Sequence, residues 1–442
     1  MTRLIFSPRI SRVKVLEGRI LTTSQRTTKD LRRANRITVL RRLYFDGPLS
    51  RLNLAGRTGL SPATVGNVIA ELLHDRIVVE TGQLDSDGGR PAVLVEVNSK
   101  HAAVIGVDVG ETGAAIELFD LTLQKLAAVD KPFRLPQESP GSLVSVIAKG
   151  VSQVIKSARI PAERVLGIGV GVPGVVVHDG EEYISAPSLG WEKLPLLQLL
   201  EPALPAPVML DNGAKTMGRA EMWFGGGRDA RDVAVVLLGT GVGAAFFNDG
   251  ALYRGATSSA GEWGHTCVVV GGRQCRCGAQ GCLEAYVGAG AILERWAQRS
   301  RRTALRTNDE RQQLQELLVA ARSSQPAAAV LDETARYLGA GIGNLVNLFN
   351  PERIVLGGWV GHLLGPQLLE PIRQAAAAQA LRYPFSHVAI DVGRLGPDAV
   401  ALGAATLVVE RFLDSGGRPS VGVPSQRSAE SNRGGRAMIS RT

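Results

Sequence analysis

A histidine and three cysteines within one short stretch have the most specific chemistry in this chain. Thiolate sulfur and imidazole nitrogen are the usual ligands of closed tetrahedral zinc sites. Gly278 and Gly281 permit the tight loop that would gather the three sulfur atoms around one ion. The stretch therefore predicts a zinc site. Its expected ligands are His265, Cys275, Cys277 and Cys282.

The alternative for these cysteines is a set of unrelated buried thiols. All four cysteines of the chain fall within the same window, and in a reducing compartment such clustering favours metal ligation over disulfides. Cys267 is the one left over. We expect it to be a buried strand residue, because free cysteines are commonly found in protein cores.

Two glycine-containing turns after apolar strands suggest phosphate chemistry. The first covers 106–112 and places Asp108 at a strand end, and the second covers 238–243. In such turns an aspartate can hold a metal, and glycine lets the backbone approach phosphate. Gly357 and Gly358 follow a third strand, where an adenosine would pack. Any tight hairpin can use Asp and Gly, so the prediction depends on the repetition.

The elements that must position these residues are short apolar strands alternating with helices over 101–413. With the paired turns, this pattern predicts an α/β chain whose body has the two-lobed actin-like ATPase (ribonuclease H-like) fold of sugar kinases. No apolar run approaches the ~20 residues of a membrane helix, and the N-terminus lacks the apolar stretch of a signal peptide. We therefore expect a cytoplasmic protein without a membrane partner.

The charge of the 442-residue chain is concentrated at its N-terminus. The formal net charge is +9. Residues 1–60 contain 12 Arg and 2 Lys against three acidic residues, a net charge of +11, whereas residues 61–413 have a net charge of −5. A basic head on a mildly acidic body indicates a polyanion-binding module attached to another domain. The alternative is a disordered basic tail that only aids solubility.

The residues that follow the first 27 predict a winged helix-turn-helix. Ser50 and Ser61 can each cap a helix, and Gly59 between them supplies the residue that ends the first of the two. Apolar periodicity predicts the preceding helix. The expected elements are helices over 31–46, 51–58 and from Pro62 onward, then strands over 77–81 and 92–97 joined by a turn at 87–91 that forms the wing.

One face of the third helix in this head suits DNA recognition. Small and amide side chains face away from its apolar side, and such side chains fit a major groove. Arg90 in the wing can reach a phosphate or a narrow minor groove. The alternative is a small helical bundle used for protein contacts. The expected DNA contacts are Arg51, Ser61, Ala63, Thr64, Asn67 and Arg90.

The chain thus divides into four expected segments. They are a flexible basic arm at 1–27, a winged helix-turn-helix domain at 28–97, a sensor body at 101–413, and a tail at 414–442. The tail is rich in Gly, Ser and Arg, a composition typical of disorder.

The sequence resembles the ROK family (repressors, open reading frames and kinases) over residues 30–412. The resemblance is carried by the head, Asp108-x-Gly-x-Thr112, Gly171-Val-Pro-Gly174, and Glu262-x-Gly-His265 followed by Cys-x-Cys-Gly-x-x-Gly-Cys-x-Glu at 275–284. It implies structural zinc on the four ligands above, and carboxylates that accept hydrogen bonds from sugar hydroxyls. The sugar contacts it implies are Gly174, Ser188, Asn212, Glu262, His265 and Glu284.

The chain departs from the kinases of this family where they carry their catalytic base. Their Glu-Asn-Asp-Ala-Asn stretch, whose Asp removes the sugar hydroxyl proton, corresponds here to Asp-Asn-Gly-Ala-Lys at 211–215, a register fixed by Glu-Met-Trp-Phe-Gly at 221–225. Gly213 stands at the base position and cannot accept a proton, a loss of ~10²–10⁴ in rate. Asp211 would lie about 7 Å away along a strand, so no catalytic residue is expected.

Further departures affect the other ligands. Glu111 replaces the usual Gly of the first phosphate turn, and Gly113 replaces a Lys or similar residue. A carboxylate beside a triphosphate is repulsive, so ATP is not expected as a ligand. Ser188 stands where the kinases have Asn, so the choice of sugar can differ.

The resemblance implies a DNA-binding transcriptional regulator, a repressor of carbohydrate genes, with a sugar-sensing and catalytically inactive kinase-like body. The expected partners are double-stranded DNA with a pseudo-palindromic operator, a sugar or sugar phosphate, and a second copy of the chain in a homodimer or homotetramer. One alternative is an active ROK sugar kinase with an accessory head. Another is a zinc-stabilised scaffold that senses a transport protein.

Overall fold

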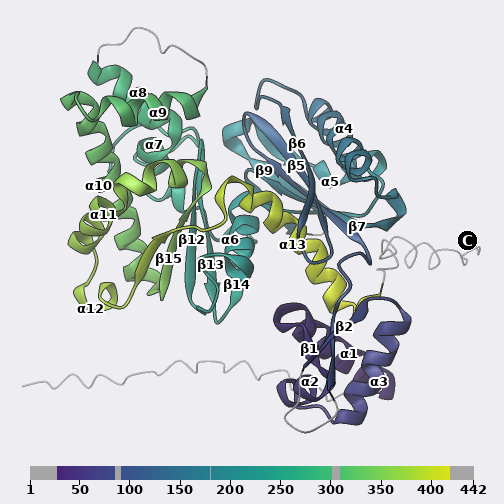
Figure 1. Cartoon of the computed structure of the whole chain (residues 1–442). Helices are drawn as coiled ribbons and strands as arrows, with labels where there is room; N and C mark the ends of the chain where they lie inside the picture. Colours follow the sequence, from purple (N-terminus) through teal and green to yellow (C-terminus); the bar gives the residue numbers. More distant parts are fainter. Residues whose placement is uncertain (1–26, 85–90, 180, 301–308, 419–442) are drawn as a thin grey trace, which may run out of the picture.

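The computed structural model describes residues 27–84, 91–179, 181–300 and 309–418. They form a small head and two larger α/β lobes (Figure 1). The head lies at one end of the first lobe, and the second lobe lies beside the first (Figure 1). The predicted combination of a winged helix-turn-helix with a two-lobed α/β body is confirmed.

The head contains the expected helices and strands. Ser50 and Ser61 cap their helices by accepting hydrogen bonds from Asn53 N and Thr64 N, and Gly59 ends the first of them at φ 70°. The first helix begins three residues before the predicted start, because Thr27 and Asp30 form a capping box there. The elements are α1 Thr28–Asp46, β1 Leu49–Ser50, α2 Arg51–Thr58, α3 Pro62–His74, β2 Val78–Leu84 and β3 Ala92–Val97.

The first lobe, lobe 1, is built on a five-stranded sheet in the order β11-β7-β4-β5-β6. Strands β4, β5 and β6 form an antiparallel meander, and β7 and β11 continue the sheet in parallel. The strands are β4 Ala103–Val109, β5 Gly113–Asp120, β6 Lys125–Pro132, β7 Val165–Val172 and β11 Val208–Asn212. Helix α4 Pro140–Ala158 packs on this sheet, and β8 Val175–Asp179, β9 Glu181–Ala186 and β10 Trp191–Leu194 form a separate small sheet.

The second lobe, lobe 2, repeats this topology in the order β14-β13-β12-β15-β16. It again has an antiparallel meander followed by two parallel strands, so the two related turns in the sequence do mark two similar lobes. The strands are β12 Val233–Leu238, β13 Val242–Asn248, β14 Ala251–Tyr253, β15 Arg353–Gly357 and β16 Ala389–Val392. The helices of this lobe are α7 Glu284–Val287, α8 Ala289–Ser300, α9 Glu310–Ala320, α10 Gln325–Phe349, α11 Gly358–Gln379 and α12 Arg382–Phe385.

Helices α6 Gly213–Phe224 and α13 Ala399–Asp414 lie between the two lobes (Figure 1). They pack closely against each other, because a Cβ on Gly403 of α13 would overlap the carbonyl oxygen of Thr216 in α6. A Cβ on Gly106 of β4 would likewise overlap the backbone of α13. Backbone therefore meets backbone at this junction, and small movements of one helix are transmitted to the other.

The head shares a hydrophobic core with lobe 1 and α13. Side chains from α1, α3 and β3 pack in one cluster with Val104, Phe119 and Leu121 of lobe 1 and with Val408 and Phe412 of α13. The head is therefore attached by packed apolar side chains as well as by its covalent link.

The predicted start of the tail at 414 is wrong for its first five residues. Helix α13 continues to Asp414, and the backbone N–H groups of Ser415, Gly416 and Gly417 donate to carbonyls of its last turns. Gly416 and Gly417 are also buried against α1. Composition suggested disorder, whereas contacts with the distant head order this segment.

No helix among the described residues is long and apolar enough to cross a membrane.

Candidate functional site

The four predicted metal ligands converge in one loop region of lobe 2. His265 ends the short helix η4 Trp263–His265, and the three cysteines lie in the loop that leads to α7. The ligand atoms of His265, Cys275, Cys277 and Cys282 all lie within 4.8 Å of one another. The distance from Cys275 Sγ to His265 Nδ1 is 3.7 Å, and the distance from Cys277 Sγ to Cys282 Sγ is 3.8 Å.

These spacings fit a tetrahedral zinc ion. Ordinary Zn–S and Zn–N bond lengths give ligand–ligand edges of about 3.5–3.8 Å. Gly278 and Gly281 have φ values of 95° and 79°, which are the left-handed turns that the tight loop requires. The residues present therefore fit a closed site with three thiolates and one imidazole.

The prediction for Cys267 is wrong, because its side chain is exposed. The residue forms only an isolated β-bridge to Cys282 and does not lie in a core strand. It is not one of the four residues that could hold a metal. The apolar residues around it in the sequence suggested a strand. The loop at 265–282 that carries the four expected metal ligands, called the metal loop below, instead turns this segment outward.

Three of the expected sugar contacts gather beside this loop. Glu262 directly precedes η4, His265 ends it, and Glu284 begins α7. The carboxylate of Glu284 is held by the N–H of Val242, at 2.9 Å from Oε2. Burial raises the pKa of Glu262, and the nearby His265 partly opposes this. Nδ1 of His265 faces the thiols, so with a metal bound there Nε2 would be the ring nitrogen that donates a hydrogen bond.

A fourth expected contact, Asn212, caps the start of helix α6. Its Oδ1 accepts from Ala214 N at 2.9 Å and from Lys215 N at 3.3 Å, and its Nδ2 donates to Gly174 O at 2.7 Å. Gly174 has φ 84°, and a Cβ there would meet Ala186 Cβ at 2.5 Å. Asn212 therefore fixes both the start of α6 and the turn at Gly174.

Ser188 is not joined to the other expected sugar contacts by a hydrogen bond within the described part of the chain. It lies in the short helix η2 Pro187–Leu189 and is half-buried. Ala186, two residues earlier at the end of β9, packs against Gly174. The structure therefore places Ser188 near the turn at Gly174 without assigning it a partner.

Gly213 is the first residue of α6, directly after β11. Asp211 does not replace the missing base, because its carboxylate is buried and paired with Arg254, at 2.6 Å from Nη2 to Oδ2. This pair joins β11 of lobe 1 to the segment after β14 of lobe 2. The carboxylate of Asp211 is therefore already engaged by a guanidinium.

Lys215 is a site residue that sequence reasoning missed. It is almost fully buried in α6, and its Nζ donates to the carbonyl oxygen of Ser258. Burial lowers its pKa, and the nearby Asp211 and Glu262 oppose this shift. A lysine at the position of a family Asn was visible in the sequence, but its burial was not.

In the two glycine-containing turns expected to contact a nucleotide, side chains pair with other side chains of the protein. Glu111 in the β4–β5 turn contacts Arg276 of the metal loop, at 2.7 Å from Nη1 to Oε2. Thr240 in the β12–β13 turn donates from Oγ1 to Glu310 Oε2 at 2.8 Å. Burial raises the pKa of Asp108 to about 7, which weakens its use as an anionic metal ligand near neutral pH.

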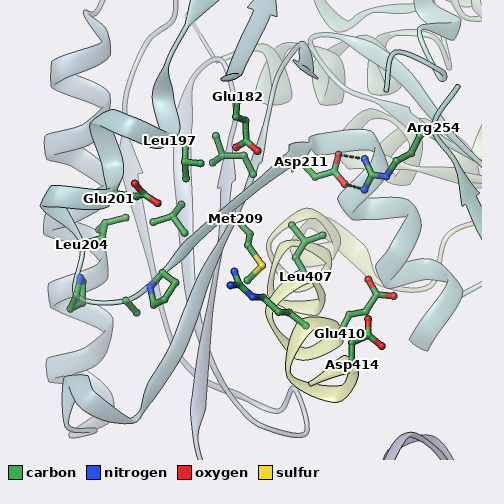
Figure 2. Close-up of a pocket in the computed structure, with 16 residues that line it drawn as sticks. Glu182, Leu197, Glu201, Leu204, Met209, Asp211, Arg254, Leu407, Glu410 and Asp414 are labelled. Atoms are coloured by element: carbon green, nitrogen blue, oxygen red, sulfur yellow. Dashed lines mark hydrogen bonds and ion pairs between the residues drawn. The ribbon is translucent and has the colours of Figure 1, made fainter. Parts of the chain in front are cut away.

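A groove of about 950 Å³ is lined by β11, the segment before it and the C-terminal half of α13. Figure 2 shows Asp211 and Arg254 paired at one end of it and Met209 toward Leu407 of α13, with Glu410 and Asp414 on the other side of that helix. None of the expected sugar contacts lines this groove. The residues expected to bind a sugar therefore lie around the start of α6 and the loop at 265–282, and not in this groove.

The expected DNA-contact face of the head is only partly free. Ala63 and Asn67 are exposed on α3, whereas the Ser61 hydroxyl lies 2.9 Å from that of Thr64 and caps the helix. Arg51 pairs with Glu80 of β2, at 2.8 Å from Nη2 to Oε1. Arg90, the expected wing contact, lies outside the described residues.

Residues 104–411 match the sequence profile of the ROK family. This chain belongs to the ROK family. The match covers both lobes and the helices between them, so the resemblance inferred from the zinc loop and the glycine turns is confirmed.

Curated and structural relatives agree with this membership. A xylose repressor from Caldicellulosiruptor bescii is 29% identical over 389 residues, which are 87% of this chain and 97% of that protein. A crystal structure of a ROK family transcriptional regulator, a homologue of the Escherichia coli MLC protein, covers 88% of this chain and 98% of its own, with a TM-score of 0.73 and 24% identity. The latter supports the fold of head and lobes together.

A ROK kinase resembles the lobes without the head. The glucokinase from Streptomyces griseus, solved with glucose and AMPPNP, is 28% identical with a TM-score of 0.61. It covers 69% of this chain, whereas this chain covers 99% of the kinase. The chain is therefore similar to a whole sugar kinase with additional residues.

Proposed function

We propose that this ROK protein is a DNA-binding transcriptional repressor of carbohydrate genes that responds to a sugar in the cleft between its lobes. The repressor relative matches both head and lobes over nearly its full length. The head has the helices of a helix-turn-helix DNA-binding domain. In the body, Gly213 stands where the kinases carry their catalytic base. These features favour a sensor over the kinase alternative.

The observation that carries this proposal is the course of helix α6. Its start is capped by Asn212 in the cleft, and its last turn presents Trp223 to the head. The ring centroid of Trp223 lies 4.9 Å from Phe45 and 6.1 Å from Tyr44, both in α1. A helix of 12 residues spans about 18 Å, so one rigid element connects the expected sugar contacts to the head.

Helix α13 supplies a parallel connection. Arg219 of α6 forms an ion pair with Glu410 of α13. One turn further along α13, Asp414 accepts from Arg41 Nη2 at 2.5 Å, and just beyond the helix Gly416 O accepts from Arg36 Nε at 2.6 Å. Arg36 and Arg41 belong to α1. A change in lobe angle that moves α6 therefore also moves the segment that holds α1.

The mechanism that we propose is a population shift between two lobe arrangements. A sugar that binds more tightly to one arrangement increases its population. The associated movement of α6 and α13 changes the position of the head, and in a homodimer or homotetramer it changes the separation of two heads. Two-fold related heads bind half-sites spaced by about one or two helical turns, ~34 Å each, so a small rotation changes operator affinity.

Zinc in the loop at 265–282 would have a structural role in this mechanism. When bound, it holds His265, Cys275, Cys277 and Cys282 in one rigid unit. That unit positions Glu262 and Glu284 next to the cleft, where their carboxylates accept hydrogen bonds from vicinal hydroxyls. The ligand class that fits is a sugar, a sugar phosphate or a related polyol, and contact with DNA places the protein in the cytoplasm.

The expected DNA contacts divide into base-reading and phosphate-binding residues. Ala63 and Asn67 are exposed on α3 and suit contact with base edges in a major groove. Ser61 and Thr64 lie at the start of the same helix, where they suit contacts to the DNA backbone. Arg51 and Arg90 add positive charge for phosphates.

The experiment that tests this function measures DNA binding by the full chain. Fluorescence anisotropy at physiological salt compares the protein's own promoter region with random DNA of equal length. We expect at least about a thousandfold preference. A thermal-shift screen of pentoses, hexoses, amino sugars and their phosphates then identifies the effector, which raises Tm by binding the native state. Equal affinity for promoter and random DNA would exclude the repressor function.

A further inference from the structure

An ion-pair network crosses the cleft between the metal loop and the first glycine turn. Arg276 lies between two expected metal ligands, Cys275 and Cys277. Its Nη1 is 2.7 Å from Oε2 of Glu111 in lobe 1, and its Nη2 is 3.4 Å from Oε1 of Glu284 in lobe 2. The two carboxylates are largely buried, and Arg276 is about half exposed. One guanidinium therefore joins carboxylates of both lobes.

The network meets the second glycine turn as well. A Cβ built on Gly241 would lie 3.4 Å from Glu284 Oε2 and 3.9 Å from both Glu111 Oε1 and Arg276 Nη2. The turns at 110–112 and 239–241 thus face the same small volume from opposite lobes. Glycine turns of this kind expose backbone N–H groups and admit an anion. Two carboxylates lie at this volume: Glu284 Oε2 accepts from Val242 N of the second turn at 2.9 Å, and Glu111 of the first turn pairs with Arg276.

We propose that the carboxylates of Glu111 and Glu284 occupy the space between the two glycine turns, and that the ion pair of Glu111 with Arg276 ties lobe 1 to the metal loop of lobe 2. We call Glu111, Arg276 and Glu284 the interlobe bridge. The bridge replaces a nucleotide as the group that holds the two lobes together. The ligand class excluded by Glu111 is a nucleoside triphosphate with its divalent metal.

Charge and hydrogen bonding both support this exclusion. Two carboxylates share one guanidinium, so the bridge retains a net negative charge, and a triphosphate placed beside it is repelled. The hydroxyl of Thr240, which could donate to a phosphate, already donates to Glu310. The nucleotide side of the cleft is therefore closed by side chains of the protein itself.

The bridge also has a consequence for sugar sensing, and this consequence rests on the proposed function. Glu284 is both a bridge residue and an expected sugar contact. A hydroxyl that donates to Glu284 competes with Arg276 for that carboxylate and changes how tightly the lobes are joined. The sugar alone can then shift the lobe angle, with no requirement for a second ligand.

The test uses the full chain and two substitutions of Glu111. Glu111→Gly removes the side chain, and Glu111→Gln keeps its shape without its charge. Isothermal titration with Mg–AMPPNP is expected to give no saturable binding to the unsubstituted protein and binding at least about tenfold tighter to Glu111→Gly. Saturable binding of equal strength to both proteins, or no gain in Glu111→Gly, would overturn the exclusion.

Small-angle X-ray scattering without ligand tests the tie between the lobes. Glu111→Gln is expected to increase the radius of gyration, because the lobes are no longer joined through Arg276. The matched control is Asp332→Asn, which removes a carboxylate from an exposed ion pair within α10, the pair Asp332–Arg336. An unchanged radius in Glu111→Gln, or an equal increase in the control, would refute the bridge. Neither measurement uses sugar or DNA, so these results are independent of the repressor test.

Discussion

At position 213 the chain lacks a proton acceptor, although packing does not require glycine there. A Cβ at Gly213 would meet Val172 O at 3.7 Å and Val400 Cγ1 at 3.9 Å, which are ordinary contacts. At Gly218, one turn later in the same helix, a Cβ would meet Ala245 Cβ at 2.5 Å. Packing therefore does not account for the glycine at 213, whereas it does account for Gly218.

A pair of substitutions tests this difference. Gly213→Asp is expected to leave Tm nearly unchanged, whereas Gly218→Ala is expected to cost about 1–3 kcal/mol by overpacking. Gly213→Asp is also expected to show no sugar-dependent ADP release, because the interlobe bridge still excludes the nucleotide. Calorimetric melting and a coupled ADP assay measure the two effects. Robust turnover by the unsubstituted chain would instead identify it as a kinase.

The metal ligands give a second prediction for single residues. Cys282→Ser is expected to reduce bound zinc well below one ion per chain and to lower Tm, because binding to the native state alone stabilises it. Cys267→Ser is the matched control, since Cys267 is exposed and outside the ligand set. Elemental analysis and thermal melting provide the readouts. Equal zinc content in the two variants would exclude the four-ligand site.

At the scale of elements, helix α3 presents its exposed face through few side chains. Asn67 is exposed there, and an amide can form a bidentate contact with adenine. We expect Asn67→Ala to weaken promoter binding by about 5- to 150-fold while leaving affinity for random DNA unchanged. Asn53→Ala, on the exposed face of α2, serves as the control. Fluorescence anisotropy measures the affinity for both DNAs. An equal loss of affinity for promoter and random DNA would contradict this role.

Helix α6 is the element whose two ends serve different tasks. Trp223→Ala is expected to reduce the effect of the sugar on operator affinity while leaving sugar binding intact, because the contact with Tyr44 and Phe45 is lost. Phe224→Ala is the matched control, since Phe224 is partly exposed and its ring contacts only Trp223 among the described aromatic pairs. Binding curves with and without the identified sugar give the coupling free energy. An unchanged coupling in Trp223→Ala would exclude α6 as the connection.

At the scale of the whole molecule, a buried carboxylate links the stability of lobe 1 to pH. Burial raises the pKa of Glu117 in β5 to about 7, although Lys125 partly opposes this. Lys125 also pairs with Asp398 at the start of α13, at 2.6 Å from Nζ to Oδ2. The folded state thus holds a proton on Glu117 that the unfolded chain, with its ordinary pKa near 4.5, has released.

The resulting pH dependence has a definite sign. Because the folded state binds more protons between about pH 4.5 and 7, the unfolding free energy is expected to fall as pH rises through this window. Glu117→Gln is expected to reduce that slope by about half, because burial also raises the pKa of Asp108 to about 7. Glu163→Gln, at an exposed glutamate, is expected to keep the slope. Denaturant unfolding of the three proteins from pH 5 to 8 measures the slope. An unchanged slope in Glu117→Gln would assign the pH dependence of the unfolding free energy to other groups.

Local signals were sufficient for the head and for the metal loop. Ser50, Gly59 and Ser61 act within their own helices, so capping chemistry alone located α2 and α3. The four metal ligands lie within 18 residues of one another, and their types define the ion that they suit. Gly213 was found in the same way, because a fixed motif register needs no tertiary contact.

Contacts between residues far apart in the chain were decided only by the tertiary structure. The Arg276–Glu111 pair spans 165 positions and the Arg254–Asp211 pair spans 43, and no local pattern specifies such pairs. Cys267 was misjudged, and the tail was predicted to begin too early, for the same reason: burial depends on which distant surface a segment meets. The sequence by itself determined a DNA-reading head, a metal loop and a sensor without its base. Only folding determined that α6 runs from Asn212 to the contact of Trp223 with α1 and that Glu111 meets Arg276 between the lobes, because both depend on how the two lobes pack around the interlobe helices.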